Sequence, residues 1–167
     1  MGAKDAMLLF ELDQDAAVMK YINGGKLTSM KEIKEVYIPR MAEYTRAEKG
    51  WGLWQVNVTN TQEFIGWILV RPMHFFSEQP QWNNWELGWR FKQASWGKGY
   101  ATEAAKQIMN TLASTQSVKY FSAIAVPDNL ASINIMKKLG MQYLKTDLHQ
   151  DPLGDMKVVY YQVSNCL

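Results

Sequence analysis

Two glycines flank a lysine in the segment Trp96-Gly97-Lys98-Gly99-Tyr100-Ala101-Thr102, directly after a strand-like run and at the start of a helix-forming stretch. Glycine allows the backbone to approach an anion closely. The free N–H groups at the start of a helix, with the positive end of its dipole, favour negative charge. The order of these residues therefore predicts a phosphate site built from backbone donors.

The spacing of these glycines excludes two common nucleotide-binding motifs. No glycine stands five residues before Gly97, so the segment is not a P-loop. The third glycine of the dinucleotide-binding fingerprint is also missing. Neither motif explains the segment.

A second motif follows further along the chain, as Asn129-Leu130-Ala131-Ser132 and then Lys138-Leu139-Gly140-Met141. Together the two motifs resemble the GNAT superfamily of acetyl-CoA-dependent N-acetyltransferases, with its Gln/Arg-x-x-Gly-x-Gly/Ala and Asn-x-x-Ala/Ser…Lys-x-Gly-Phe motifs. The segments that begin at Asp15, Phe64 and Glu86 are similar to the branch that includes the N-terminal acetyltransferases of ribosomal proteins. The resemblance extends over residues 13–163.

The resemblance implies how the cofactor is bound. Backbone N–H groups of Gly97–Thr102 would hold the pyrophosphate of coenzyme A, and Lys98 either adds charge or is a solvated lysine. The end of the strand at Phe91 would pair through its backbone with the pantetheine arm, as an added strand does. Asn129 would bond the cofactor arm or the substrate, and it also suits the N-cap of a helix. Trp96 replaces the usual Gln or Arg, which removes one polar side chain but leaves the backbone donors.

The resemblance also implies catalytic roles for two side chains. Attack by an amine requires a neutral nitrogen, a group that takes the proton and a donor near the departing sulfur. Ser132 is the implied donor, and its alternative is a small residue in a first helical turn. Glu86 stands where some members keep a catalytic glutamate, and its alternative is a strand-edge carboxylate paired with Arg90. Backbone N–H groups of that strand would stabilise the oxyanion of a tetrahedral intermediate.

Several positions depart from the family pattern. Met136 stands where many relatives have a tyrosine general acid, and Ile124 stands where some have a strand glutamate, so a tyrosine-based mechanism is in question. His149, Asp151 and Asp155 are alternative bases, but the two aspartates are also typical turn residues.

Composition narrows the class of protein. The length of 167 residues suits one domain, residues 1–167, with a sizeable core. A net charge of +2 is too small to indicate nucleic acid or an anionic membrane surface as a partner. No apolar run is long enough to span a membrane, so we expect a cytoplasmic protein. One cysteine, Cys166, and two histidines, His74 and His149, argue against a disulfide framework and a metal site.

Periodicity and turn residues predict the elements that must position these residues. A capping box at Ser29 and Glu32 opens the second helix, and Pro39 should kink or divide it. Residues 72–84 read as a loop. The expected elements are helices 6–22, 28–49, 97–114 and 130–139 and strands 53–59, 64–70, 85–91, 120–126, 141–146 and 157–163.

This order indicates a mixed α+β domain whose sheet is mostly antiparallel and is interrupted by one strand–helix–strand unit. The resemblance implies a GNAT-like twisted sheet of about six strands with helices on both faces. The N-terminal strand of that family is short or missing before Asp15. Its absence would expose a sheet edge, for which a swapped or homodimeric arrangement is one remedy.

The function that the resemblance implies is acetyl transfer from acetyl-CoA to a primary amine, with a protein N-terminal α-amine favoured. The alternatives are a small-molecule amine, such as an aminoglycoside, polyamine or amino acid, and a coenzyme A-binding module without catalysis. A closed pocket near Trp51, Trp82 and His74 would favour a small molecule, and an open groove would favour a peptide. The aromatic segment 75–85 lacks an acidic cluster, which disfavours a strongly cationic amine.

Overall fold

The computed structural model describes residues 1–165, and Cys166 lies outside them. The chain forms two compact units. Unit 1 consists of Met1–Leu69 and Trp89–Ala101, and unit 2 consists of Val70–Gly88 and the chain from Thr102 onward. No helix among residues 1–165 has the length and apolar character needed to cross a bilayer.

The strands form one six-stranded sheet, which confirms the expected mixed α+β fold. Its order is β1-β2-β3-β4-β6-β5, and β2 and β3 contribute residues to both units. Before β1, residues 1–51 form helices and turns, in agreement with the missing N-terminal strand. The strands are β1 (Gly52–Asn57), β2 (Phe64–Met73), β3 (Gln81–Phe91), β4 (Tyr120–Ala125), β5 (Gln142–His149) and β6 (Met156–Ser164).

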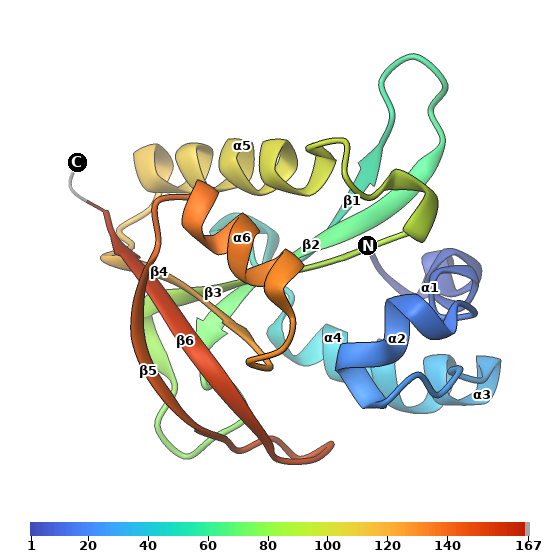
Figure 1. Ribbon diagram of the computed structural model, residues 1–167, viewed down its shortest axis with the longest axis horizontal. Helices are drawn as coiled ribbons and strands as arrows, with labels where there is room; N and C mark the ends of the chain where they lie inside the picture. The colour runs from blue at the N-terminus through green and yellow to red at the C-terminus, as the bar shows by residue number, and fades with distance from the viewer. Residues whose placement is uncertain (166–167) are drawn as a thin grey trace. The chain divides into compact units, whose positions relative to one another are not determined.

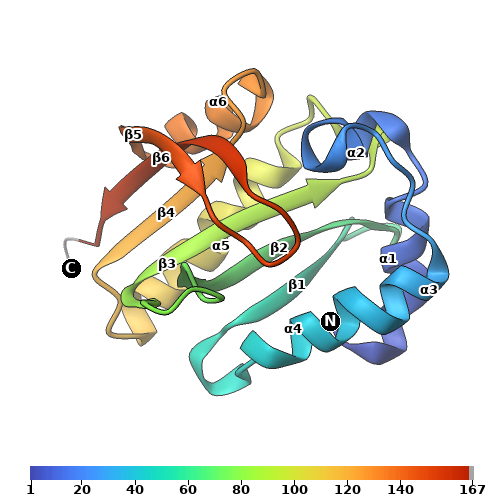
Figure 2. The same ribbon diagram turned by 90° about the horizontal axis from the view of Figure 1, so that it is seen from below.

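Unit 1 gathers four helices at its N-terminal part (Figure 2). They are α1 (Ala6–Leu12), α2 (Ala16–Asn23), α3 (Met30–Glu32) and α4 (Ile38–Tyr44). The prediction of one helix over residues 6–22 was wrong. The Asp15 carboxylate accepts a hydrogen bond from the Ala17 N–H at 2.8 Å, and this N-cap begins a new helix.

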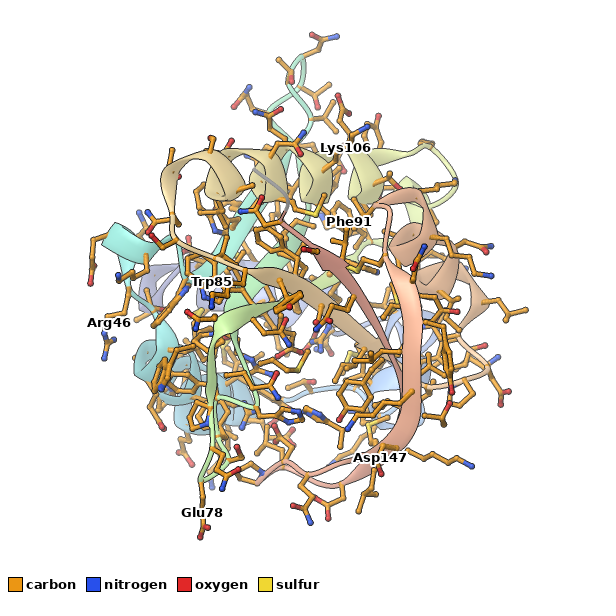
Figure 3. All side chains as sticks on the ribbon, turned by 90° about the vertical axis from the view of Figure 1, so that its left-hand side faces the viewer. Arg46, Glu78, Trp85, Phe91, Lys106 and Asp147 are labelled. Atoms are coloured by element: carbon orange, nitrogen blue, oxygen red, sulfur yellow. The ribbon has the colours of Figure 1, made fainter. Side chains whose placement is uncertain are left out.

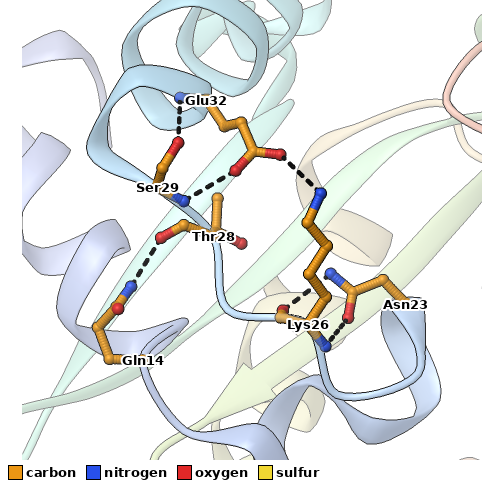
Figure 4. Close-up of polar contacts among 6 residues, drawn as sticks. All are labelled: Gln14, Asn23, Lys26, Thr28, Ser29 and Glu32. Carbon is orange, nitrogen blue, oxygen red and sulfur yellow. Dashed lines mark hydrogen bonds and ion pairs between the residues drawn. The ribbon is translucent and has the colours of Figure 1, made fainter.

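The loop between α2 and α3 confirms the capping box (Figure 4). The Ser29 hydroxyl accepts from the Glu32 N–H at 3.1 Å, and the Glu32 carboxylate accepts from the Ser29 N–H at 2.9 Å. The Gln14 side-chain amide donates to the Thr28 carbonyl at 2.7 Å. The two bonds between Ser29 and Glu32 satisfy N–H donors that the start of a helix leaves without partners.

The predicted helix 28–49 is shorter and irregular. A π-helical stretch over Ile33–Tyr37 joins α3 to α4, and Pro39 lies in the first turn of α4. Proline has no N–H to donate, so it is tolerated at the start of a helix and not in its interior. The helix therefore divides near Pro39, as expected, but ends at Tyr44 instead of Lys49.

Strand β3 is joined to β4 through α5 (Tyr100–Thr115), which confirms the expected strand–helix–strand connection (Figure 1). Strand β3 pairs in parallel with β4, which places Glu86 beside Ser122, and α6 (Leu130–Lys138) packs against β4. Strand β6 pairs antiparallel with both β4 and β5. Trp85 and Phe121 are buried and meet edge to face, with ring centroids 6.4 Å apart.

Two predicted boundaries were wrong in ways that bear on the site. Helix α5 (Tyr100–Thr115) begins three residues after Gly97, because Gly97 and Gly99 both adopt left-handed backbone. The loop expected over residues 72–84 is shorter. Strand β2 continues to Met73 and β3 begins at Gln81, so only residues 74–80 connect them.

Candidate active site

The glycine segment is an exposed loop in unit 1. Trp96, Gly97, Lys98 and Gly99 are all exposed, and the backbone φ angles are +72° at Gly97 and +80° at Gly99. Side chains other than glycine rarely adopt such angles. A Cβ added at either glycine would meet no atom within 4 Å. The backbone of this loop is therefore open to a ligand at both glycines.

The loop leads directly into α5, a helix of 16 residues. The first four N–H groups of a helix have no acceptor within it, and they lie at the positive end of its dipole. Open backbone followed by these donors matches the needs of a diphosphate. The residues present thus fit the pyrophosphate of coenzyme A, with the Lys98 ammonium exposed in the same loop.

Trp96 has a structural role that its sequence position did not reveal. Its indole N–H donates to the Phe91 carbonyl at 2.9 Å, and its backbone N–H donates to the Gln93 carbonyl at 3.0 Å. The indole thus ties the loop to the end of β3, where the pantetheine arm was expected to pair. A carbonyl oxygen has two lone pairs, so Phe91 retains the capacity to accept a second hydrogen bond.

Gly66 explains how β2 approaches the same end of β3. A Cβ added at Gly66 would lie 2.8 Å from the Cα of Phe91 and would also collide with the Arg90 carbonyl. Only glycine permits this close approach. The Lys92 N–H donates to the Ile65 carbonyl at 2.8 Å, which continues the strand contact past Phe91.

Glu86 belongs to unit 2, and its partner is Arg71 of the same unit. The Arg71 Nε donates to the Glu86 carboxylate at 2.8 Å, and the two side chains are 10% and 6% exposed. The predicted alternative, an edge carboxylate paired with Arg90, was wrong. Glu86 lies in an interior strand, and Arg90 instead bonds Asp13 at 2.7 Å in unit 1.

A chain of polar side chains runs across three strands of unit 2 beside this ion pair. The Ser122 hydroxyl donates to the Asn84 side-chain oxygen at 2.7 Å and accepts from the Gln162 amide at 3.1 Å. The Asn84 amide donates to the Gln81 side chain at 2.7 Å. Asn84 and Glu86 are two residues apart on β3 and so share one face of the sheet. Unit 2 thus carries a buried polar face.

A second polar group in unit 2 consists of the rings of His74, His149 and Tyr160. The His149 Nδ1 and the Tyr160 hydroxyl are 2.8 Å apart and buried, and the His74 ring stacks on His149 with centroids 5.2 Å apart. Burial, and then the charge of His149, lower the pKa of His74, while Glu86 opposes this shift. Burial raises the pKa of Tyr160 to about 12, with smaller effects of Asp147 and Glu86.

A cavity of about 360 Å³ opens beside these rings. Figure 3 labels Asp147 on β5, which lines the cavity, and Glu78 in the loop that connects β2 to β3. His74 has a left-handed φ of +58°, which is costly for a side chain of this size. The cavity is lined by His74, Ser77, Asp147, Leu148 and Gln150.

Asn129 and Ser132 lie together at the start of α6, also in unit 2. The Asn129 side-chain oxygen accepts from the Ser132 N–H at 3.3 Å, so Asn129 is the N-cap of α6. Ser132 is half-buried in the first turn. Met136 is wholly buried, so it packs in the core at the position of the usual tyrosine.

The remaining candidate bases in the β5–β6 hairpin are structural. The Asp151 carboxylate accepts from the Leu153 N–H at 2.9 Å, and the Asp155 carboxylate accepts from the Asp151 N–H at 3.0 Å. The interpretation of both aspartates as turn residues is confirmed. Among residues 1–165, no three His, Cys, Asp or Glu side chains lie close enough to hold a metal ion.

The structure thus brings together some of the expected residues. Phe91 contacts Trp96 in unit 1, and Asn129 contacts Ser132 in unit 2. Sequence reasoning missed Arg71 as the partner of Glu86 and the bond between His149 and Tyr160. The sequence signal for the Arg71–Glu86 pair was an arginine inside the apolar run of β2. No sequence signal indicated the bond between His149 and Tyr160.

Comparison with known proteins agrees with this architecture. Residues 1–142 match the family model described as the acetyltransferase (GNAT) domain. The chain is 32% identical over 149 residues to the uncharacterized protein YkkB of Bacillus subtilis (strain 168), covering 87% of this chain and 81% of that one.

Two solved structures share the fold. One is AAC(6')-Ib in complex with paromomycin and acetyl-CoA, with a TM-score of 0.76, 18% identity and coverage of 98% of this chain and 90% of that one. The other is RimL, a ribosomal L7/L12 alpha-N-protein acetyltransferase, in complex with coenzyme A, with a TM-score of 0.72, 14% identity and coverage of 96% and 89%. The chain therefore belongs to the GNAT family of acetyl-CoA-dependent N-acetyltransferases.

Proposed function

We propose that this chain works as one catalytic domain that transfers acetyl from acetyl-CoA to the α-amine of a polypeptide N-terminus. The observation that carries the proposal is the open loop at Gly97 and Gly99 in front of α5, because it offers backbone donors to a diphosphate. The thioester of acetyl-CoA supplies the activated acetyl group. In this proposal Gly97–Thr102 bind the pyrophosphate and the end of β3 at Phe91 pairs with the pantetheine arm.

The side chains of unit 2 supply the proton transfers in this proposal. Ser132 donates a proton toward the departing sulfur, and Asn129 orients the first turn of α6 that carries Ser132. Glu86, held by Arg71, takes the proton of the acceptor amine. His74 is a second proton acceptor, since its lowered pKa keeps the imidazole neutral at pH 7.

An α-amine suits this set of groups better than a lysine side chain. The α-amino group has a pKa of about 8, against about 10.4 for lysine, so a far larger fraction of it is neutral at pH 7. A site whose carboxylate is already bonded to an arginine therefore needs to remove a proton from a smaller fraction of α-amine substrate than of lysine substrate. The similarity of fold to RimL, a protein α-amine acetyltransferase by name, also supports this acceptor.

A small-molecule amine is the second candidate, and the cavity beside His74 favours it. Its volume of about 360 Å³ is that of a small-ligand pocket. Its one lining carboxylate, Asp147, pairs with Lys145 at 3.3 Å. An amine with several positive charges would find little net negative charge there, which favours the peptide over an aminoglycoside.

The test is an acetyl transfer assay that measures release of free thiol with peptides of varied N-terminal residue, aminoglycosides and polyamines. We expect turnover with peptides that have a free α-amine and none with their N-acetylated counterparts. The Ser132→Ala variant should lower kcat about tenfold or more, because general acid–base catalysis typically contributes about 10²–10⁴-fold. Turnover with an aminoglycoside but with no peptide would contradict the proposed acceptor, and an unchanged kcat would remove Ser132 from the mechanism.

A further inference from the structure

Strand β5 is the outer strand of the sheet at the β6 end (Figure 1). It pairs with β6 on one side, and every residue from Gln142 to Leu148 is exposed. Tyr143, Leu144 and Leu148 are each more than half exposed. An edge strand with apolar side chains is a ready template for another strand.

The sequence of this edge is symmetric in chemistry about Thr146. Residues 142–150 read Gln-Tyr-Leu-Lys-Thr-Asp-Leu-His-Gln. Gln142 and Gln150 are equally distant from Thr146. The same holds for the aromatic residues Tyr143 and His149 and for Leu144 and Leu148. Lys145 and Asp147 then flank Thr146 with opposite charges. A strand with this symmetry is complementary to itself when it runs antiparallel.

We propose that β5 of one copy pairs antiparallel with β5 of a second copy, centred on Thr146, to form a homodimer. In this register Lys145 of each copy stands opposite Asp147 of the other, so two oppositely charged pairs form. Leu144 stands opposite Leu148, and Thr146 stands opposite itself. Opposite charges and paired apolar or threonine side chains are the cross-strand contacts that stabilise antiparallel sheets.

The local geometry of β5 agrees with this arrangement. The bulge lies at Leu144, and the regular ladder from Lys145 to His149 contains Thr146 and both charged residues of the proposed pairing. Lys145 and Asp147 of one chain are 3.3 Å apart, with side chains 51% and 58% exposed. Such an exposed pair contributes little to stability, so Lys145, which also lies over the Tyr160 ring at 5.0 Å from its centroid, can exchange Asp147 of its own chain for Asp147 of the other at little cost. Bonding of the Asp147 carboxylate to the Leu148 N–H, and then to Lys145, lowers the pKa of Asp147, which is therefore an anion at neutral pH.

Charge reversal tests the register by analytical ultracentrifugation of the full chain. Lys145→Asp alone and Asp147→Lys alone each place like charges opposite one another twice, and we expect each to weaken dimerisation about tenfold or more. An equimolar mixture of the two variants restores opposite pairs, so we expect a heterodimer as strong as the wild-type dimer. Lys106→Asp on the exposed face of α5 is the matched control and should dimerise as wild type does.

A symmetric cross-link gives a second readout that does not depend on charge. Directly opposed residues in antiparallel strands have Cα atoms about 4.5–5.5 Å apart, within the range of a disulfide. Thr146→Cys in a Cys166→Ser background should therefore oxidise to a covalent dimer, while Lys106→Cys in the same background should not. A monomeric wild type, or a dimer that both charge reversals leave unchanged, would overturn the proposal. The latter result would instead favour pairing through the edge at β1.

Discussion

The glycine loop of unit 1 and the polar face of unit 2 present their polar groups in opposite ways. The loop, Trp96–Gly99, is exposed and offers its backbone. The polar face is buried and works through side chains that hold one another. Glu86 is held by Arg71, Ser122 by Asn84 and Gln162, and His149 by Tyr160.

The difference shows where function and stability are coupled. Backbone donors in an exposed loop require only that the backbone can adopt the binding conformation. A substitution there should therefore change ligand binding with little effect on the free energy of unfolding. A buried polar side chain that loses its partner is costly to the fold itself. Mutations on the polar face should therefore change the free energy of unfolding, whereas mutations in the loop should change cofactor affinity.

The largest effect is expected from breaking the buried ion pair. Arg71→Met leaves the Glu86 carboxylate buried without its guanidinium, which typically costs about 3–5 kcal/mol. Chemical denaturation would measure the loss. The double variant Arg71→Met, Glu86→Leu removes both charges and should recover most of it. An Arg71→Met variant as stable as wild type would contradict the claim that the buried polar face contributes to the free energy of unfolding.

A smaller effect is expected from breaking the hydrogen bond between His149 and Tyr160. Tyr160→Phe removes the hydroxyl that bonds the His149 Nδ1, and a buried polar group without a partner costs about 1–3 kcal/mol. Tyr143→Phe is the matched control, because its hydroxyl meets Thr146 in an exposed position. We expect that control to unfold as wild type does. Equal losses of free energy of unfolding in the two variants would show that burial does not increase the contribution of the His149–Tyr160 bond to stability.

The smallest effect is a pH dependence carried by His74. Its pKa is lowered in the folded state, so below the ordinary value of about 6.5 the unfolded chain binds the proton more readily. Stability should thus fall as the pH drops through 6.5 toward the folded pKa. His74→Gln should remove this part of the pH dependence, as measured by denaturation at pH 5 and pH 7.5. An identical pH dependence in the variant would contradict the role of His74.

The same contrast explains what the sequence could predict. The glycine loop, the capping box at Ser29 and the parallel β3–β4 pair depend on local signals, namely glycine spacing, a four-residue motif and a helix between two strands. The partner of Glu86 depends on the register of β2 against β3, which local patterns do not encode. The helix starts after Asp15 and Gly99 were missed because the backbone angles of single residues, and not the apolar period, set where α2 and α5 begin.

The central claim is that backbone donors around Gly97 and Gly99 hold the diphosphate, and calorimetry with coenzyme A tests it most directly. Gly99→Glu places a carboxylate where the anion would bind, while Gly24→Glu imposes the same left-handed strain, at φ +81°, in equally open space elsewhere in unit 1. We expect wild type and Gly24→Glu to bind with similar affinity, and Gly99→Glu to lose binding heat at the same protein concentration. Equal binding by all three proteins, or no binding by wild type, would contradict the account.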